Sequence, residues 1–444
     1  MAGIIASAVS QLKDRLLDFL HPQRLALVAG ELGLEWRETV LALPNLVTLF
    51  ARQVLLGNVS MPELARQAGS QFTPEAYCTA RRRMPLELLQ ELLRRIVQWT
   101  GQHIGQDPGL LWKGHRLWHM DGSGFSMPDT PELQKHFGQP GGQKPGCGFP
   151  VAHVLCLFDA ATGLIADCIC SPLRTADVSG AHRLHPQMRR GDVLIADRAF
   201  QSFVHLALLL RQGLGAILPV HHKRKLDFRR KRQRCGRKGQ RLSRQVLRKL
   251  GSCDQIVRWF KPKGKPRWMS QRLFDALPQT LDVRELKRTV LLPSGRQQTI
   301  VVITTLLDAQ VYPPEELVGL LKDRWQVEIN LRHLKTTMKM DVLRSKTVAG
   351  VRKELWMFLI VYNLVRWVML AAARQQRVPV GRISFADALY WVRHGDLTRP
   401  LPVLAVVPDR PGRIEPRAYK RRHKEYDRLN RPRKVMRNRL RRRR

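Results

Sequence analysis

Residues 191–220 read GDVLIADRAFQSFVHLALLLRQGLGAILPV, in which two short apolar runs flank a longer one. The outer runs, VLIA and LGAILPV, have the length and composition of buried strands. The central run, SFVHLALLLRQG, repeats apolar residues at the spacing of a helix. A strand, a helix and a second strand in succession indicate an α/β unit.

The preceding sequence predicts three more strands. One is expected in LLWKGHRLWHMDGSGFSM, residues 110–127. Two others flank an Asp-Ala-Ala-Thr-Gly turn in FPVAHVLCLFDAATGLIADCICSPL, residues 149–173, and should form a hairpin. Residues 181–188, AHRLHPQM, read as a short helix. Three strands followed by alternating helix and strand predict a mixed sheet.

The N-terminal part, residues 1 to about 110, reads as helices with apolar residues three and four apart. Its segments SMPELARQAG (60–69) and TPEAYCTARRRM (73–84) could form a helix-turn-helix-like pair that reads DNA. A small helical bundle would show the same pattern, so both interpretations remain open.

The charge of the chain predicts a polyanionic partner. Its 444 residues hold 77 Lys and Arg against 36 acids, a formal charge of +41, and 44% of them are hydrophobic, enough to fold. Nucleic acid is the leading candidate, because phosphates attract many separate cations through counterion release. Two segments concentrate the charge, 223–249 with fourteen Lys and Arg and the tail 411–444 with sixteen. The tail is expected to be disordered when free of a partner.

Other features bear on architecture and location. Residues 223–305 read as a β-rich insertion, and helices return at 306–375. The apolar run 355–373 includes Asn363 and Arg366, which favours a buried helix over a membrane span. Seven scattered cysteines without a CxxC pair suit a reducing cytoplasm and argue against a disulfide framework or structural zinc.

Three acids stand where a phosphoryl-transfer site could form. Asp121 follows LWHM at an expected meeting of strand and loop, and Asp197 ends the strand in GDVLIAD. Glu328 lies on a predicted helix, within one narrow stripe with Arg324 and Lys335. Two carboxylates from adjacent strands and one from a helix can hold a pair of Mg²⁺ ions that clamp the attacking and leaving oxygens. An Arg324–Glu328 ion pair that stabilises only the helix is the plainer interpretation.

Together these motifs resemble the bacterial DDE transposases of the insertion-sequence four family. That family carries a helical Y-x2-R-x3-E-x6-K motif, which Arg324, Glu328 and Lys335 match, whereas Leu321 stands at the tyrosine position. HMDGSGF and IADRAF resemble its two aspartate motifs, and DVLRSKTVAGVRKEL resembles the segment after the glutamate. The departure at Leu321 bears on the fine positioning of the strand end and not on the metal site, because the family tyrosine is expected to contact DNA rather than metal.

The resemblance implies a ribonuclease H-like catalytic core, residues 111–222 and 306–375, interrupted by the insertion 223–305. It also implies a helical DNA-binding domain over 1–110 and a C-terminal region, 376–444, that ends in the basic tail. Asp121, Asp197 and Glu328 would be the catalytic metal ligands, for two Mg²⁺ ions or Mn²⁺ in their place.

By the same resemblance, Arg324 and Lys335 would hold DNA phosphates, with Arg344 and Lys346 as further DNA contacts. The partners would be double-stranded transposon ends and target DNA, bound by a homodimer in the bacterial cytoplasm at the nucleoid. Trp259 or Trp268 could stack on a flipped base, although a core tryptophan is the more ordinary interpretation.

Three alternatives stay open on the sequence. A non-transposing nuclease with a ribonuclease H-like core would share the three carboxylates. A structural nucleic-acid-binding protein would account for the charge but not for the acids. A transition-metal site at HRLWHM or at the His pair 221–222 lacks the usual ligand spacing.

Overall fold

The computed structural model describes residues 21–103, 108–173, 175, 177–220, 224, 226–228, 244–291, 297–396, 399–408 and 429–442. The predicted helix at the start of the chain, the His pair 221–222 and most of the two basic segments lie outside these residues. Within the basic tail, Arg433–Arg441 form a helix, so the expectation of a disordered tail is wrong for these residues.

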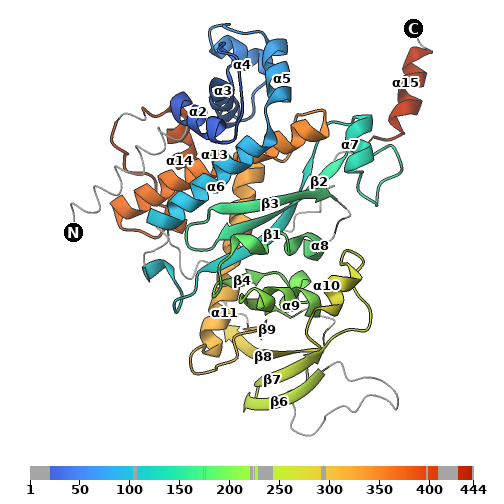
Figure 1. The fold of residues 1–444 in the computed structure, drawn as a ribbon, viewed down its shortest axis with the longest axis vertical. Helices are drawn as coiled ribbons and strands as arrows, with labels where there is room; N and C mark the ends of the chain where they lie inside the picture. Colours follow the sequence, from blue (N-terminus) through green and yellow to red (C-terminus); the bar gives the residue numbers. More distant parts are fainter. Residues whose placement is uncertain are drawn as a thin grey trace.

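The described chain folds into helices around one sheet (Figure 1). The strands are β1 (Leu117–Ser126), β2 (Val151–Asp159), β3 (Ile165–Pro172), β4 (Val193–Ala196), β5 (Gly215–Pro219), β6 (Arg244–Gly251), β7 (Asp254–Phe260), β8 (Thr280–Leu291) and β9 (Gln297–Thr304). The α-helices before the sheet and between its strands are α2 (Pro22–Glu31), α3 (Leu43–Leu55), α4 (Met61–Gln67), α5 (Pro74–Arg83), α6 (Leu86–His103), α7 (Pro131–His136), α8 (Asp177–Ala181), α9 (Phe203–Arg211) and α10 (Gln271–Asp275). After the sheet come α11 (Pro314–Asp323), α12 (Trp325–Arg332), α13 (Val348–Gln376), α14 (Phe385–His394) and α15 (Arg433–Arg441). Short 3₁₀ helices are η1 (Pro108–Leu110), η2 (His185–Gln187), η3 (Arg198–Phe200) and η5 (Val380–Arg382), and η4 (His333–Thr337) is a π-helix.

The sheet has nine strands in the order β3-β2-β1-β4-β5-β9-β8-β7-β6. Strands β1, β4 and β5 are parallel, and the predicted hairpin of β2 and β3 adds to the free edge of β1. The mixed sheet expected from the sequence is therefore present. Strands β6–β9, in the segment that the sequence predicts to be an insertion, continue the same sheet, because β9 pairs antiparallel with β5.

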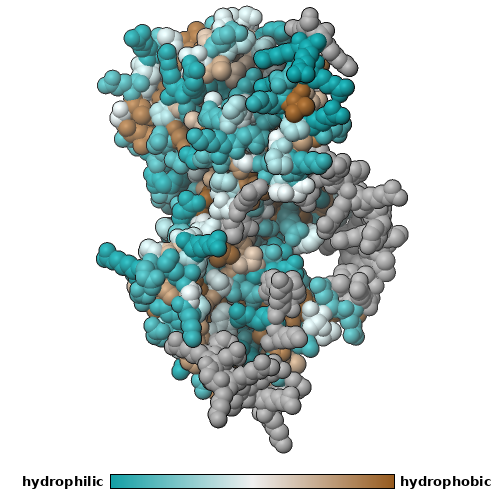
Figure 2. Space-filling view, turned by 90° about the vertical axis from the view of Figure 1, so that its right-hand side faces the viewer, coloured by the Kyte–Doolittle hydropathy of each residue, from teal (hydrophilic) through white to brown (hydrophobic). Residues whose placement is uncertain are grey.

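Helices cover both faces of the sheet, and strand alternation decides which residue meets which layer. Trp118 and Met120 of β1 point into a core with α9. Phe125, whose side chain lies on the opposite face of β1, packs in the core that holds α13 and the N-terminal helices. Helices α2–α6 and α14 lie at one end of the molecule and β6–β9 at the other (Figure 1). The face shown in Figure 2 is largely hydrophilic, with apolar residues scattered among the polar ones.

Helix α13 is the centre of the largest core. It is long and apolar enough to cross a membrane, but its most apolar window is fully buried in the protein. Two of its buried polar residues hold the turn between β2 and β3. Asn363 pairs with the backbone of Ile165, and Arg366 donates from Nε to the carbonyl of Thr162 at 3.0 Å. The prediction of a buried helix is confirmed.

Several local expectations need correction. The helix expected at 181–188 is replaced by α8 and η2, because Pro186 lies inside the segment and limits a continuous helix. Trp259 does not project as a base-stacking wedge, since it is 3% exposed in the core beside β8. Trp268 stacks on His182 with ring centroids 4.9 Å apart.

One buried carboxylate joins three parts of the fold. Glu354 of α13 is 1% exposed. Its oxygens accept from the backbone N–H groups of Arg344 and Ser345, both at 2.8 Å, and from the Asn58 side chain at 2.7 Å. The loop that carries Arg344 and Lys346 is thereby fixed to the turn after α3.

We expect Glu354→Ala to destabilise the protein by about 3 kcal/mol, because the substitution leaves three donors without their acceptor. The measurement is urea unfolding followed by circular dichroism. Glu132→Ala is the matched control, since Glu132 is exposed and, among the described residues, accepts a single hydrogen bond, from the backbone of Val348 at 2.8 Å. Equal loss in the two variants would contradict the role given to Glu354.

Candidate active site

The register of two parallel strands brings Asp121 and Asp197 together. Met120 of β1 lies opposite Ala196 of β4, and each aspartate is the next residue. Asp121 does not end its strand as the sequence suggested, because β1 runs on to Ser126 in its pairing with β2. Strand β4 does end at this level, after Ala196, and Asp197 begins the turn that follows it, beside the continuing strand β1.

Glu328 reaches the same place from the helical layer. It lies in the first turn of α12, and this helix packs on β1. Its side chain is 38% exposed, whereas that of Asp121 is 22% exposed. A strand, a strand end and a helix thus supply one carboxylate each.

Arg324 contacts two of these carboxylates. Its guanidinium lies 3.1 Å from Glu328 Oε1 and 3.5 Å from Asp121 Oδ2. The Arg324–Glu328 ion pair that the plainer interpretation predicts is present, and the contact with Asp121 extends it across to the sheet. Such a contact exceeds a local helix pair, because it joins residues about two hundred positions apart in the sequence.

The pKa of Asp121 reports its surroundings. Burial raises the pKa of its carboxyl to about 6, the Gly122 N–H at 2.8 Å and the Arg324 charge oppose the rise, and the charges of Asp197 and Glu328 add to it. Asp121 therefore feels both other acids, which makes the three one electrostatic site. A perturbed carboxyl in such a cluster is typical of functional positions.

A buried histidine pair supports the turn that carries Asp197. His205 Nδ1 lies 2.8 Å from the carbonyl oxygen of Phe200, at the end of this turn, and its Nε2 lies 3.0 Å from Nε2 of His185. Since the carbonyl can only accept, Nδ1 carries the proton and His185 donates to His205. Burial lowers the pKa of His205 to about 4 and that of His185 to about 2, so both are neutral. No sequence pattern predicts this pair, because single histidines among apolar residues resemble ordinary core positions.

The cations expected to contact DNA have different surroundings. Lys335 belongs to the π-helix η4, and its Nζ lies 5.6 Å from the ring centroid of Phe125, farther along β1. Arg344 and Lys346 are exposed on the loop held by Glu354. Leu321 packs at the edge of the core formed by β4, β5 and α11.

The carboxylates are not gathered around a ready metal centre. Within the described part of the chain, no group of three or more His, Cys, Asp or Glu side chains is arranged to hold a metal ion. The Arg324 cation instead balances Asp121 and Glu328. The donor set still fits Mg²⁺ in kind, because it offers only carboxylate oxygens, and Asp121 is poorly solvated and near other acids.

Comparison with known proteins places this site in a family. Residues 112–364, more than half of the chain, match the Transposase DDE domain. The chain therefore belongs to the transposase DDE domain family, and the resemblance seen in the sequence is confirmed.

Two curated relatives and one solved structure are similar. The Escherichia coli transposase InsG for insertion sequence element IS4 is 25% identical over 310 residues, which are 68% of this chain and 62% of that protein. The putative transposase InsZ of the same species is 23% identical over 223 residues, 46% of this chain and 75% of its own. The piggyBac transposase synaptic complex with hairpin DNA aligns with a TM-score of 0.44 and 9% identity, over 85% of this chain and 78% of that one.

Asp121→Asn should stabilise the metal-free protein at pH 7 but hardly at pH 4. The folded chain binds the Asp121 proton more tightly than the unfolded chain does, so the wild type loses stability as pH rises through about 6. At pH 7 the ionised Asp121 lowers the free energy of unfolding by about 3 kcal/mol, and asparagine avoids this loss. Thermal unfolding with a chelator, at both pH values, measures it. Asp341→Asn, which removes an exposed carboxylate, is the control, and an unchanged melting temperature at pH 7 would refute the account.

Proposed function

We propose that this protein is a DNA transposase that binds the terminal inverted repeats of an insertion sequence and catalyses metal-dependent cleavage and strand transfer. The observation that carries the proposal is the meeting of Asp121, Asp197 and Glu328 within a chain of the transposase DDE domain family. The chain covers 62% of the InsG transposase, so the complete reaction is a proposal rather than a consequence of family membership.

The strand order supports a ribonuclease H-like core. Strands β3-β2-β1-β4-β5 form one half of the sheet, and β2 alone runs against the others. We assign residues 111–222 and 306–375 to this core, 223–305 to the insertion, 1–110 to DNA binding and 376–444 to a C-terminal region. Helices α4 and α5 are then the candidates for recognition of the transposon ends.

Membership of the DDE family implies a divalent metal in general, and we assign two Mg²⁺ ions to Asp121, Asp197 and Glu328, with Mn²⁺ as a substitute. When bound, the metal would make a water or a 3′-OH nucleophilic and stabilise charge on the leaving oxygen. The three acids would hold the metal, and each is positioned by a different element, namely β1, the end of β4 and α12. No covalent bond between protein and DNA is needed.

Arg324 has a different role before and after DNA binds. In the free chain its guanidinium neutralises Asp121 and Glu328, which would otherwise repel each other. With a metal bound by these acids, the Arg324 guanidinium would be free to contact a DNA phosphate, for which its planar fork is suited. Lys335, Arg344 and Lys346 would hold further phosphates, and the basic segments would add contact independent of sequence.

DNA is the proposed partner, as two transposon ends and a target, and a homodimer would pair the ends. The bacterial cytoplasm, at the nucleoid, is the proposed location. The net charge of +41 is consistent with a strong phosphate contribution to binding.

Asp121→Asn, Asp197→Asn and Glu328→Gln should each bring cleavage of an end-sequence duplex below detection while DNA binding changes little. Each removes a metal ligand but no phosphate contact. Cleavage is followed on labelled duplex with Mg²⁺, and binding by fluorescence anisotropy. Asp341→Asn, which removes an exposed carboxylate outside the site, is the control. A variant of the three acids that cleaves as well as this control would remove that residue from the site.

Arg324→Ala should have opposite effects on two measurements. Binding of Mn²⁺ without DNA should tighten, because Asp121 and Glu328 lose their internal cation, whereas cleavage should slow by about 10- to 100-fold through loss of a phosphate contact. Titration calorimetry and single-turnover cleavage give the two values. In Lys335→Ala, the comparison variant, cleavage should slow without a change in metal affinity. Normal cleavage by Arg324→Ala would leave Arg324 as a helix-stabilising residue only.

A further inference from the structure

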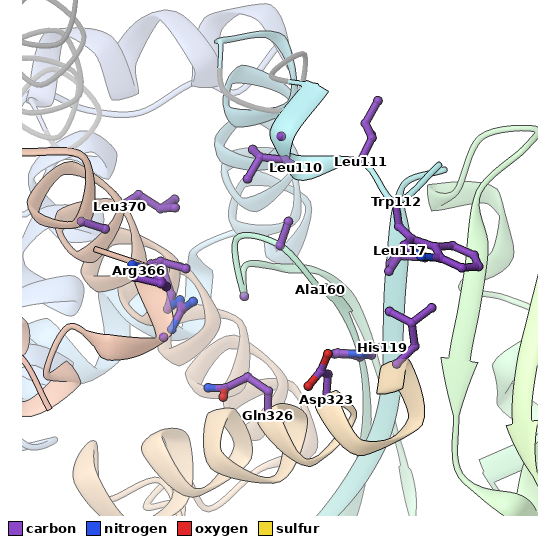
Figure 3. Close-up of a pocket in the computed structure, with 18 of the residues that line it drawn as sticks. Leu110, Leu111, Trp112, Leu117, His119, Ala160, Asp323, Gln326, Arg366 and Leu370 are labelled. Atoms are coloured by element: carbon purple, nitrogen blue, oxygen red, sulfur yellow. The ribbon is translucent and has the colours of Figure 1, made fainter. Parts of the chain in front are cut away.

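A cavity of about 1030 Å³ is lined by residues that precede the three carboxylates by two positions in the chain, among them His119, Ile195 and Gln326. Figure 3 shows its walls, with Leu117 and His119 of β1 on one side and Arg366 and Leu370 of α13 on another, and with Asp323 and Gln326 from α11 and α12 between them. Its volume is at the upper end of the range of small-molecule sites.

The register of the sheet fixes how close the cavity is to the acids. His119 lies opposite Ile195 in the pairing of β1 with β4, and both line the cavity. Asp121 and Asp197 come two residues later on the same face of the same strands, a distance of about 7 Å. If the phosphate to be cleaved lies at the three acids, the neighbouring nucleotide of the same strand would reach the cavity.

The charged residues of the cavity favour an anion. Lys322, Arg374 and Arg377 line it, and no ion pair of these three is found among the described residues. The fourth cation, Arg366, is engaged by the Thr162 carbonyl. Asp323 is the one acid in the lining, and burial raises the pKa of its carboxyl.

His119 supplies a polar group inside an otherwise apolar wall. It is 4% exposed and lines the cavity. Neither ring nitrogen has a hydrogen-bond partner within the part of the chain that the structure describes. Imidazole nitrogens can donate to or accept from the polar atoms at the edge of a nucleobase. Trp112 and Leu111 line the same cavity and offer apolar surface to a base.

We propose that this cavity binds one unpaired nucleotide of the substrate DNA, next to the phosphate that is cleaved. His119 contacts the edge of the base, and Arg374 and Arg377 contact its phosphate. The assignment rests on the proposed transposase function, because it takes the DNA strand to lie across the three acids. It adds a site that the carboxylates and the phosphate-binding residues do not provide.

Three duplexes of the end sequence test the proposal with the full-length protein and Ca²⁺ in place of Mg²⁺. One is blunt, one carries a single unpaired nucleotide at the cleaved end, and one carries an abasic unit there. The wild type should bind the extended duplex about tenfold more tightly than the blunt one, with the abasic duplex between them.

The variants separate the two contacts. His119→Leu should lower affinity for the extended duplex to that for the abasic one. Arg374→Gln combined with Arg377→Gln should lower the affinities for the extended and the abasic duplex to that for the blunt duplex. These two arginines lie near the surface, so this double variant still tests the proposal if His119→Leu fails to fold. Arg332→Gln removes an exposed cation of α12 outside the cavity and should leave the ratios unchanged.

Equal binding of the three duplexes by the wild type, or an unchanged preference in the double arginine variant, would overturn the proposal. If the same preparation still cleaves an intact end with Mg²⁺, the transposase assignment stands although the nucleotide site does not. Failure to bind or cleave any DNA would overturn both.

Discussion

The parallel pairing of β1 with β4 is the constraint on which the candidate site depends. A shift of one residue in that register would turn His119, Asp121 and Phe125 to the opposite face, into the core against α9. Trp118 and Met120, which alternate with these residues along β1, prevent this shift because they are buried on the face of the sheet that α9 covers. The positions of the acids therefore follow from how their apolar neighbours pack.

Charge balance is the second requirement. Three acids meet at a partly buried place, which is unfavourable unless a cation is present. In the free chain Arg324 meets this need in part, and the raised pKa of Asp121 shows that the compensation is incomplete. The site retains unfavourable charge that a divalent cation can relieve, which is a general reason why functional sites are less stable than their surroundings.

Much of the fold could be predicted from the sequence, because its signals are local. The hairpin of β2 and β3, the β4-α9-β5 succession and the burial of α13 follow from apolar periodicity and turn residues. Asp121 within a strand was missed, because Gly122 and Gly124 resemble a loop when pairing with β2 cannot be seen. The Arg324–Asp121 contact, the histidine pair behind Asp197 and the cavity at His119 depend on residues distant in sequence, and no periodic pattern encodes them.

The continuity of the sheet across β5 and β9 has a consequence for synthesis of the chain. Pro219 pairs with Val302, so more than eighty residues of insertion must leave the ribosome before β5 gains its second neighbour. Until then β5 is an edge strand rich in apolar residues, the kind of edge that pairs with other chains. A chain that stops between β5 and β9 would keep this edge exposed and would tend to aggregate.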